Sequence, residues 1–163
     1  MIRLWRLSNS EDLVPRARPA GRWHYAGAPV LALDASPAAA VFARLAHAEA
    51  EHPRSLPRHY VLLEIEAPRA TVAEVEAPVH WRTDTSATRT VGNAWLAQGD
   101  ALLLRVPSSA GGVQYLLNAA HPRIGQCRIV ASLAYPFGQH LTGIARAVQE
   151  DAGWLVGWRP GEE

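Results

Sequence analysis

The chain contains no lysine, because all sixteen of its basic residues are arginine. This absence excludes chemistry that depends on a lysine amine, such as a Schiff base with a carbonyl substrate. A single cysteine, Cys127, excludes an internal disulfide and a zinc site built from several cysteines. The seven histidines do not follow the spacing of a zinc-ligand motif. We therefore expect no bound metal.

Long apolar runs are also missing from the sequence. No stretch reaches the roughly 18 apolar residues that a membrane-spanning helix needs, and the N-terminal segment turns polar after Leu7, unlike a secretory signal peptide. The formal net charge is only +1, which does not favour a nucleic-acid-binding surface. We expect a cytoplasmic protein that contacts neither membrane nor nucleic acid directly.

What the sequence does contain is typical of one globular domain. Its 163 residues are 48% hydrophobic and 19% charged, and no linker-like stretch divides them. The hydrophobic pattern predicts an α+β fold with about six or seven strands and about three helices. The expected strands are 2–7, 29–34, 59–67, 71–76, 101–106, 113–118 and 127–135, and the expected helices are 37–51, 87–99 and 139–153. Ser36 and Pro37 predict the start of the first helix, and Gly99 predicts the end of the second.

A short stretch between two glycines, Gly21 and Gly27, holds the first candidate binding residue. Arg22 follows Gly21, where the backbone can approach a ligand closely, and a guanidinium pairs with two phosphate or carboxylate oxygens at once. The alternative is a solvated arginine in a loop. The next residues, Trp23, His24 and Tyr25, fit either an aromatic wall for a base or anchors that pack the loop against the core.

Two further polar positions follow strands. Ser108 stands just after Pro107, where its hydroxyl either orients a sugar or a water, or simply stabilises a turn. Asn118 and His121 either lie at the rim of a pocket or form a turn before Pro122, and the pattern favours the turn. No histidine and carboxylate accompany Ser108 at the spacing of a nucleophile motif.

Seven segments in a fixed order resemble the RES-domain family. They are "LWRLS", "GRWHYAGAPV", "SPAAAVFARLAH", "YVLLEIE", "TRTVGNAWLAQG", "LLLRVPS" and "YLLNAAHP", and they cover about residues 2–138. The resemblance implies an ADP-ribosyltransferase-like fold with NAD+ as substrate. Members are commonly toxins of bacterial toxin–antitoxin pairs. The arginine and the serine of the family name fall on Arg22 and Ser108, and the resemblance gives both of them catalytic roles. Together with the candidates argued above from the residues themselves, the expected nucleotide-binding set is Arg22, Trp23, His24, Tyr25, Ser108 and Asn118.

The sequence departs from the family pattern at two positions. Ala32 stands where members usually have a tyrosine, and Ala43 stands where they usually have a glutamate. Cleavage of the bond between nicotinamide and ribose passes through a cation-like sugar, which a nearby carboxylate stabilises. Losing one such electrostatic group typically costs about 100- to 1000-fold in rate. The resemblance therefore implies nucleotide binding, while the alanines imply weak turnover.

Three residues are candidates to compensate for these alanines. His47 lies one helical turn after Ala43, on the same helix face. Glu64 lies on the clearest predicted strand and needs a role or a partner if it points inward. Tyr25 is a candidate to fill the space of the missing tyrosine.

Two functions are compatible with this sequence. The first is a RES-type toxin of a type II toxin–antitoxin system that degrades NAD+ by hydrolysis or phosphorolysis, or transfers ADP-ribose. The second is a RES-fold protein with little or no turnover that binds a nucleotide or a protein partner. The resemblance implies an antitoxin partner of the Xre type and allows a homodimer. A third interpretation, alanines introduced to make a toxic protein expressible, is disfavoured because Ala38, Ala39 and Ala40 belong to the same alanine-rich helix.

Residues 139–163 lie beyond the resemblance but within the single expected domain, 1–163. The segment has apolar residues at helical spacing followed by Trp154, Leu155, Val156 and Trp158. Large apolar groups in such number are rarely left exposed together. We expect this extension to pack on the domain or to form an interface.

Overall fold

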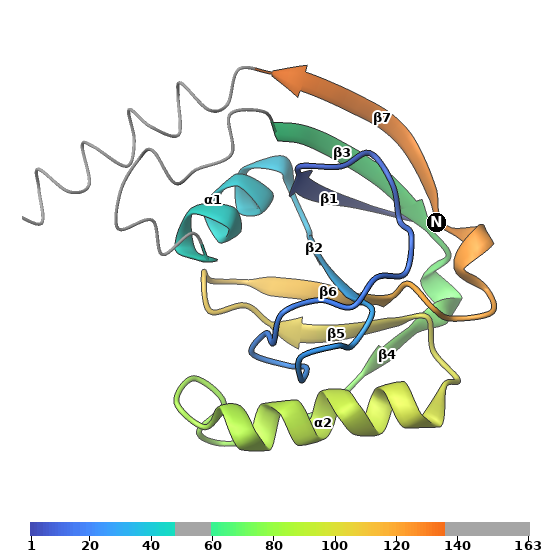
Figure 1. Ribbon diagram of the computed structural model, residues 1–163. Coiled ribbons are helices and arrows are strands. Elements are labelled where there is room, and N and C mark those ends of the chain that lie inside the picture. Colours follow the sequence, from blue (N-terminus) through green and yellow to red (C-terminus); the bar gives the residue numbers. More distant parts are fainter. Residues whose placement is uncertain (48–59, 136–163) are drawn as a thin grey trace, which may run out of the picture.

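The computed structural model describes residues 1–47 and 60–135. A seven-stranded sheet dominates this part of the chain (Figure 1). One helix lies beside the ends of the first two strands, and the other lies across the part of the sheet that contains the fourth, fifth and sixth strands. The strands are β1 (Ile2–Ser8), β2 (Val30–Asp34), β3 (Tyr60–Ala67), β4 (Val72–Glu74), β5 (Leu103–Pro107), β6 (Val113–Asn118) and β7 (Arg128–Tyr135). The helices are α1 (Pro37–His47) and α2 (Thr85–Gln98), with two short 3-10 turns, η2 (Arg69–Thr71) and η3 (Ile124–Gln126).

The sheet has the strand order β4-β5-β6-β2-β1-β3-β7. All neighbours are antiparallel except β4 and β5, which are parallel. The junction between β1 and β2 is narrow, since Trp5 and Asp34 form its one register pair. The sheet curls at this junction, so β1, β3 and β7 face β2, β6 and β5 across the interior (Figure 1).

The main core fills the inside of this curl. One half of the sheet contributes Leu4, Leu63 and Ile65, and the other contributes Leu31, Leu33, Leu103 and Leu117. A second apolar cluster lies on the opposite face of β5, β6 and β2, under α2 and the loop before β2. Its buried members are Trp23, Val30, Trp95, Leu104, Val106 and Leu116. Leu103 and Leu104 of β5 are thus buried on opposite faces of the sheet, which explains the continuous apolar sequence of this strand.

Both helices begin at side-chain caps. The backbone N–H of Ala39 donates to the Ser36 hydroxyl at 3.1 Å, as expected for the start of α1. For α2 the cap is Asp84, whose carboxylate accepts from the Ala87 N–H at 2.9 Å, so the helix starts at Thr85. Our prediction began at 87 because it missed this cap. Gly99 ends α2 with a left-handed φ of 67°, as predicted.

The α+β fold is confirmed, and the predicted strands match the observed ones to within about two residues at most ends. The final turn of the first predicted helix, the third helix and the tail after it fall outside the described residues. Within residues 1–47 and 60–135, no helix is long and apolar enough to cross a membrane.

Candidate functional site

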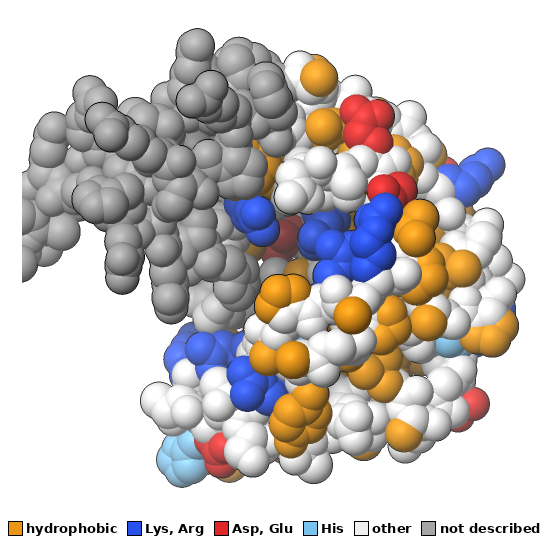
Figure 2. All heavy atoms as spheres, in the orientation of Figure 1, with side chains coloured by type: hydrophobic (Ala, Val, Ile, Leu, Met, Phe, Trp, Pro, Cys, Tyr) orange, Lys and Arg blue, Asp and Glu red, His pale blue; other side chains and the backbone are white. Residues whose placement is uncertain are grey.

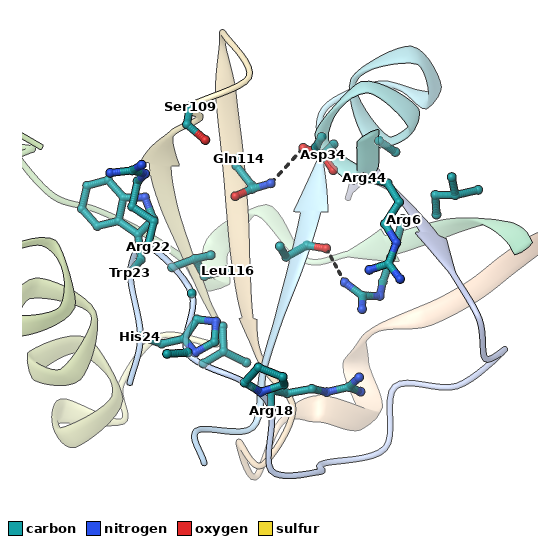
Figure 3. A pocket seen from close by; sticks show the side chains of 18 residues that line it. Arg6, Arg18, Arg22, Trp23, His24, Asp34, Arg44, Ser109, Gln114 and Leu116 are labelled. Atoms are coloured by element: carbon teal, nitrogen blue, oxygen red, sulfur yellow. Dashed lines mark hydrogen bonds between the residues drawn. The ribbon is translucent and has the colours of Figure 1, made fainter. Parts of the chain in front are cut away.

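A cleft of about 370 Å³ opens between α1, the loop before β2 and the outer face of β2 and β6. Basic side chains gather around a hollow on this face of the molecule (Figure 2). The residues that line the cleft are Arg6, Leu7, Arg18, Pro19, Ala20, Gly21, Arg22, Trp23, His24, Val30, Ala32, Asp34, Ala40, Ala43, Arg44, Ser109, Gln114 and Leu116 (Figure 3). They include four arginines and one carboxylate, so the cleft suits an anionic ligand.

The loop that carries Arg22 is held against α2 by backbone contacts. The Thr88 hydroxyl donates to the Arg22 carbonyl at 2.5 Å, and Arg89 Nε donates to the Gly21 carbonyl at 2.9 Å. Gly92 faces the Trp23 backbone so closely that a Cβ at this position would lie 1.7 Å from the Trp23 carbonyl oxygen. Only glycine permits this approach, so the loop position depends on α2.

The Arg22 side chain is oriented by the segment before α2. Its Nη1 donates to the carbonyls of Trp81 and Arg82, at 3.1 and 2.7 Å. Trp23 is buried and stacks on Trp81, with ring centroids 6.2 Å apart and an angle of 26° between the planes. Arg22 is therefore not a loosely solvated loop residue. Its guanidinium is fixed in the wall of the cleft.

Gly21 contributes by its small size. Its φ is not in the left-handed region, but a Cβ there would lie 2.5 Å from His24 Nε2. Burial lowers the pKa of His24, and nearby Arg89 lowers it further, while a hydrogen bond with the Tyr25 carbonyl acts in the opposite direction. At neutral pH the cleft therefore presents an uncharged imidazole beside Arg22.

We expect Gly92→Ala to disrupt the Arg22 loop. The new methyl group would overlap the Trp23 carbonyl, and overpacking of this kind costs about 1–3 kcal/mol or more. The melting temperature should fall by about 3–10 °C, and binding of an anion in the cleft should weaken with it.

Gly125→Ala is the matched control, because a Cβ at Gly125 meets nothing within 4 Å and its φ is not left-handed. Thermal melts and calorimetry of the two variants make the comparison. If the two variants have the same melting temperature and the same binding, the Arg22 loop shifts to make room for the methyl group and the prediction is wrong.

A second basic group lies across the cleft from Arg22 (Figure 3). It consists of Arg6 on β1, Arg18 in the loop and Arg44 on α1. Burial lowers the pKa of Arg6 to about 10, the charges of Arg18 and Arg44 lower it as well, and Asp34 alone raises it. Arg18 Nε and Arg44 Nε are buried without a hydrogen-bond partner within the described structure. Like charges crowded in this way favour binding of an anion.

Asp34 and Gln114 form the polar floor of the cleft. They are register partners on β2 and β6, and Gln114 Nε2 donates to Asp34 Oδ1 at 3.1 Å. Both side chains are buried, and Asp34 is only 5% exposed. The amide fixes the rotamer of the carboxylate, which lies between Gln114 and the basic group (Figure 3).

The two alanines at the departed positions both line this cleft. Ala32 lies on β2, two residues before Asp34 and on the same face, and its carbonyl accepts from Arg6 Nη1 at 2.9 Å. Ala43 lies on α1 and is 4% exposed. The wall therefore offers two methyl groups where a tyrosine and a glutamate would project into the cleft.

Ser108 and Ser109 occupy the turn between β5 and β6. Ser108 is buried, its Oγ accepts from the Ala110 N–H at 3.2 Å, and its backbone pairs with Gly111 and Gly112. It has the contacts of a turn-forming serine. Its neighbour Ser109 lines the cleft instead.

Tyr25 and Asn118 do not line the cleft. Tyr25 is 47% exposed on the surface of the loop. Asn118 Oδ1 accepts from the Ala120 N–H at 3.1 Å, and His121 is buried with its Nε2 2.9 Å from the Gly99 carbonyl. These contacts are those of the turn that the sequence favoured.

Of the two compensating candidates on the strand and the helix, the structure describes the side chain of Glu64 alone. Glu64 does not line the cleft and forms an ion pair with Arg3 at 2.9 Å, on the face of β3 opposite the core residues Leu63 and Ile65. His47 is the last residue of α1, and its side chain is outside the described structure.

Sequence reasoning missed Arg6, Arg18, Arg44, Asp34 and Gln114. A weak signal existed for two of them: Arg6 lies in a recognised segment, and Asp34 is a charge at the end of an otherwise apolar strand. In residues 1–47 and 60–135, no group of three or more histidine, cysteine or carboxylate side chains is placed to hold a metal ion.

Comparison with known proteins shows what this chain resembles. The model of the RES domain family matches residues 3–138. The chain is 38% identical over 133 residues to "Toxin Res" of Pseudomonas putida strain KT2440, an alignment that covers 77% of this chain and 90% of that protein. The crystal structure of the M. tuberculosis MbcT–MbcA toxin–antitoxin complex has a similar fold, with a TM-score of 0.65 at 21% identity. That match covers 87% of this chain and 89% of the solved chain.

Proposed function

We propose, from the premise that this chain belongs to the RES-domain family, that it is the toxin of a type II toxin–antitoxin pair and acts on NAD+. The observation that carries the proposal is the cleft with four arginines against one carboxylate. A dinucleotide pyrophosphate carries two negative charges, and guanidinium groups bind phosphate oxygens in a fixed, bidentate geometry.

In this proposal the two sides of the cleft contact different parts of NAD+. Arg22 is held by backbone carbonyls and needs no reorganisation to meet a phosphate. Arg18 and Arg44 have buried Nε–H groups that gain a partner when an anion binds. The apolar wall of Trp23 and Leu116 gives a ring a dry surface to pack on.

The reaction at this site is cleavage of the bond between ribose C1′ and the nicotinamide nitrogen. The electron pair leaves with nicotinamide, and the ribose becomes cation-like before an acceptor adds at C1′. The arginines hold the ADP-ribosyl part in place, so that only the leaving group and the acceptor move. Water, inorganic phosphate or a protein side chain can each act as acceptor. Ser108 or its neighbour Ser109 orients the ribose in this proposal.

The second candidate function is binding without turnover. The buried methyl of Ala43 favours it, because no carboxylate projects from α1 at the usual position. Such a protein would retain the arginine contacts and bind NAD+ or a protein partner without consuming the nucleotide.

Induced expression in bacteria tests the proposal. We expect cellular NAD+ to fall and growth to stop in cells that express the unmodified chain. A parallel strain that expresses Arg22→Ala at the same level should keep its NAD+. If the cellular NAD+ level stays unchanged in both strains while the purified chain still binds NAD+, the binding function is favoured.

The same proposal includes a protein partner and a location. We place the protein in the cytoplasm, where it meets NAD+, together with an antitoxin of the Xre type. Coexpression with the antitoxin should restore growth, and the two proteins should elute together from a sizing column. If the isolated chain elutes at twice its mass, it forms the homodimer that the family resemblance allows.

A further inference from the structure

We propose that Asp34 is a catalytic residue of this chain and supplies the carboxylate that α1 lacks at Ala43. The inference rests on the proposed action on NAD+ and deepens it, because it assigns the group that stabilises the ribosyl cation. Asp34 is the single carboxylate among the described residues that line the cleft.

The position of Asp34 follows from the register of β2. Residues 30, 32 and 34 share one face of the strand, and all three line the cleft. Leu31 and Leu33 share the other face and belong to the main core. Asp34 therefore lies on the same wall as Ala32, and the narrow junction to Trp5 of β1 sets it next to α1.

The orientation of Asp34 is set by its neighbours. Gln114 Nε2 holds Oδ1 at 3.1 Å, and the register pair between β2 and β6 fixes the distance between the two backbones. Arg6 and Asp34 both line the cleft, and the carboxylate raises the pKa of Arg6 against the effect of burial. A carboxylate held in this way is preorganised for a charge that develops in the reaction.

The chemistry that Asp34 would perform is electrostatic and leaves the atoms in balance. The C1′–N bond breaks and its electron pair goes to the nicotinamide nitrogen, which becomes neutral. The positive charge passes to the ribose ring, where the Asp34 carboxylate stabilises it. With water as acceptor, the water oxygen bonds to C1′ and one proton is released to solvent. Asp34 itself ends the cycle unchanged.

A counter-charge role is the competing explanation for Asp34. In that role the carboxylate only offsets the repulsion among Arg6, Arg18 and Arg44, so its removal would alter stability and anion affinity. A catalytic role instead lowers kcat and leaves affinity for the ADP-ribosyl part nearly unchanged. The two roles are separable because binding and turnover are measured independently.

The experiment uses the purified full chain with NAD+ as substrate and ADP-ribose as binding probe. Asp34→Asn keeps an oxygen for Gln114 and removes the charge. We expect kcat for NAD+ cleavage to fall about 100- to 1000-fold, with the dissociation constant of ADP-ribose changed less than about threefold. Adding Ala43→Glu to Asp34→Asn should restore turnover from the α1 side. Glu74→Gln, a surface carboxylate paired with Arg105 and outside the cleft, is the control.

Each remaining outcome overturns the inference in a recognisable way. If the unmodified chain turns over NAD+ and Asp34→Asn does so equally well, Asp34 is not catalytic, although the proposed function stands. If the unmodified chain is inactive and Ala43→Glu alone creates activity, the cleft is an NAD+ site without a substitute carboxylate. If neither chain is active and ADP-ribose does not bind, the proposed function fails as well.

Discussion

A double variant with Ala32→Tyr and Ala43→Glu is expected to cleave NAD+ faster than the unmodified chain, but by less than the about 100- to 1000-fold that a lone electrostatic group supplies, because Asp34 already provides one carboxylate in the cleft. Both positions line the cleft, on β2 and α1, so the new side chains project toward the same bound ligand. The glutamate adds a carboxylate near the ribose, and the tyrosine adds a hydroxyl and an aromatic face. Either change alone should give less, because the two groups act on one transition state.

Nicotinamide release, followed in a time course with purified proteins, measures this gain. Ala97→Glu is the matched control, because it adds a glutamate at an exposed position of α2 away from the cleft. Melting curves must show that the double variant is folded, since Ala43 is nearly fully buried. Fast NAD+ loss by the unmodified chain, without any gain in the double variant, would contradict this prediction and leave Asp34 as the group that supplies all of the electrostatic stabilisation.

Arg22→Ala should weaken ADP-ribose binding about 10- to 150-fold while leaving the protein folded. Hydrogen bonds to charged groups contribute about 1.5–3 kcal/mol, which corresponds to this change in affinity. The fold should tolerate the change, because the loop keeps its backbone bond to Thr88 and the Trp23–Trp81 stack. The carbonyls of Trp81 and Arg82 lose a donor but can be hydrated.

Isothermal calorimetry with ADP-ribose and a thermal melt check both parts of this expectation. Arg105→Ala is the control, since Arg105 pairs with Glu74 on the surface and does not line the cleft. Undiminished affinity in Arg22→Ala would leave the group of Arg6, Arg18 and Arg44 as the anion site. A collapse of the melting temperature would instead make Arg22 a structural residue.

The fold was predictable because its signals are local. The alternation along β3 and β6, the cap at Ser36 and the stop at Gly99 each depend on a few consecutive residues. The start of α2 was missed because it depends on the Asp84 side chain, and the sequence around it looked like a loop.

The cleft was only partly predictable because long-range packing assembles it. Arg22 stood out through its glycine and the family pattern, yet what fixes it is 59 to 60 residues away, at Trp81 and Arg82. Arg6 and Asp34 are brought to one site by the junction of β1 with β2. Nothing local in either strand shows which face the curled sheet will leave open.

Ser108 and Ser109 show how small a structural difference can escape prediction from the sequence. The family pattern pointed to Ser108, and the turn geometry buries that hydroxyl while turning the adjacent Ser109 toward the cleft. Sequence patterns do not resolve a one-residue difference in a turn, because it depends on the path of the backbone through the turn, where Gly111 and Gly112 have positive φ.

The alternation of β2 and β6 also links correct folding to a usable ligand site. Along both strands, core residues such as Leu33 and Leu117 alternate with cleft residues such as Asp34 and Gln114. A slip of one residue in either strand would move its polar side chain into the leucine core and its leucines into the cleft. Misregistered chains are therefore eliminated by their own instability. In saturation mutagenesis of β2 and β6, we expect the effects to alternate from residue to residue. Substitutions at core positions should lower protein abundance, and substitutions at cleft positions should lower NAD+ binding.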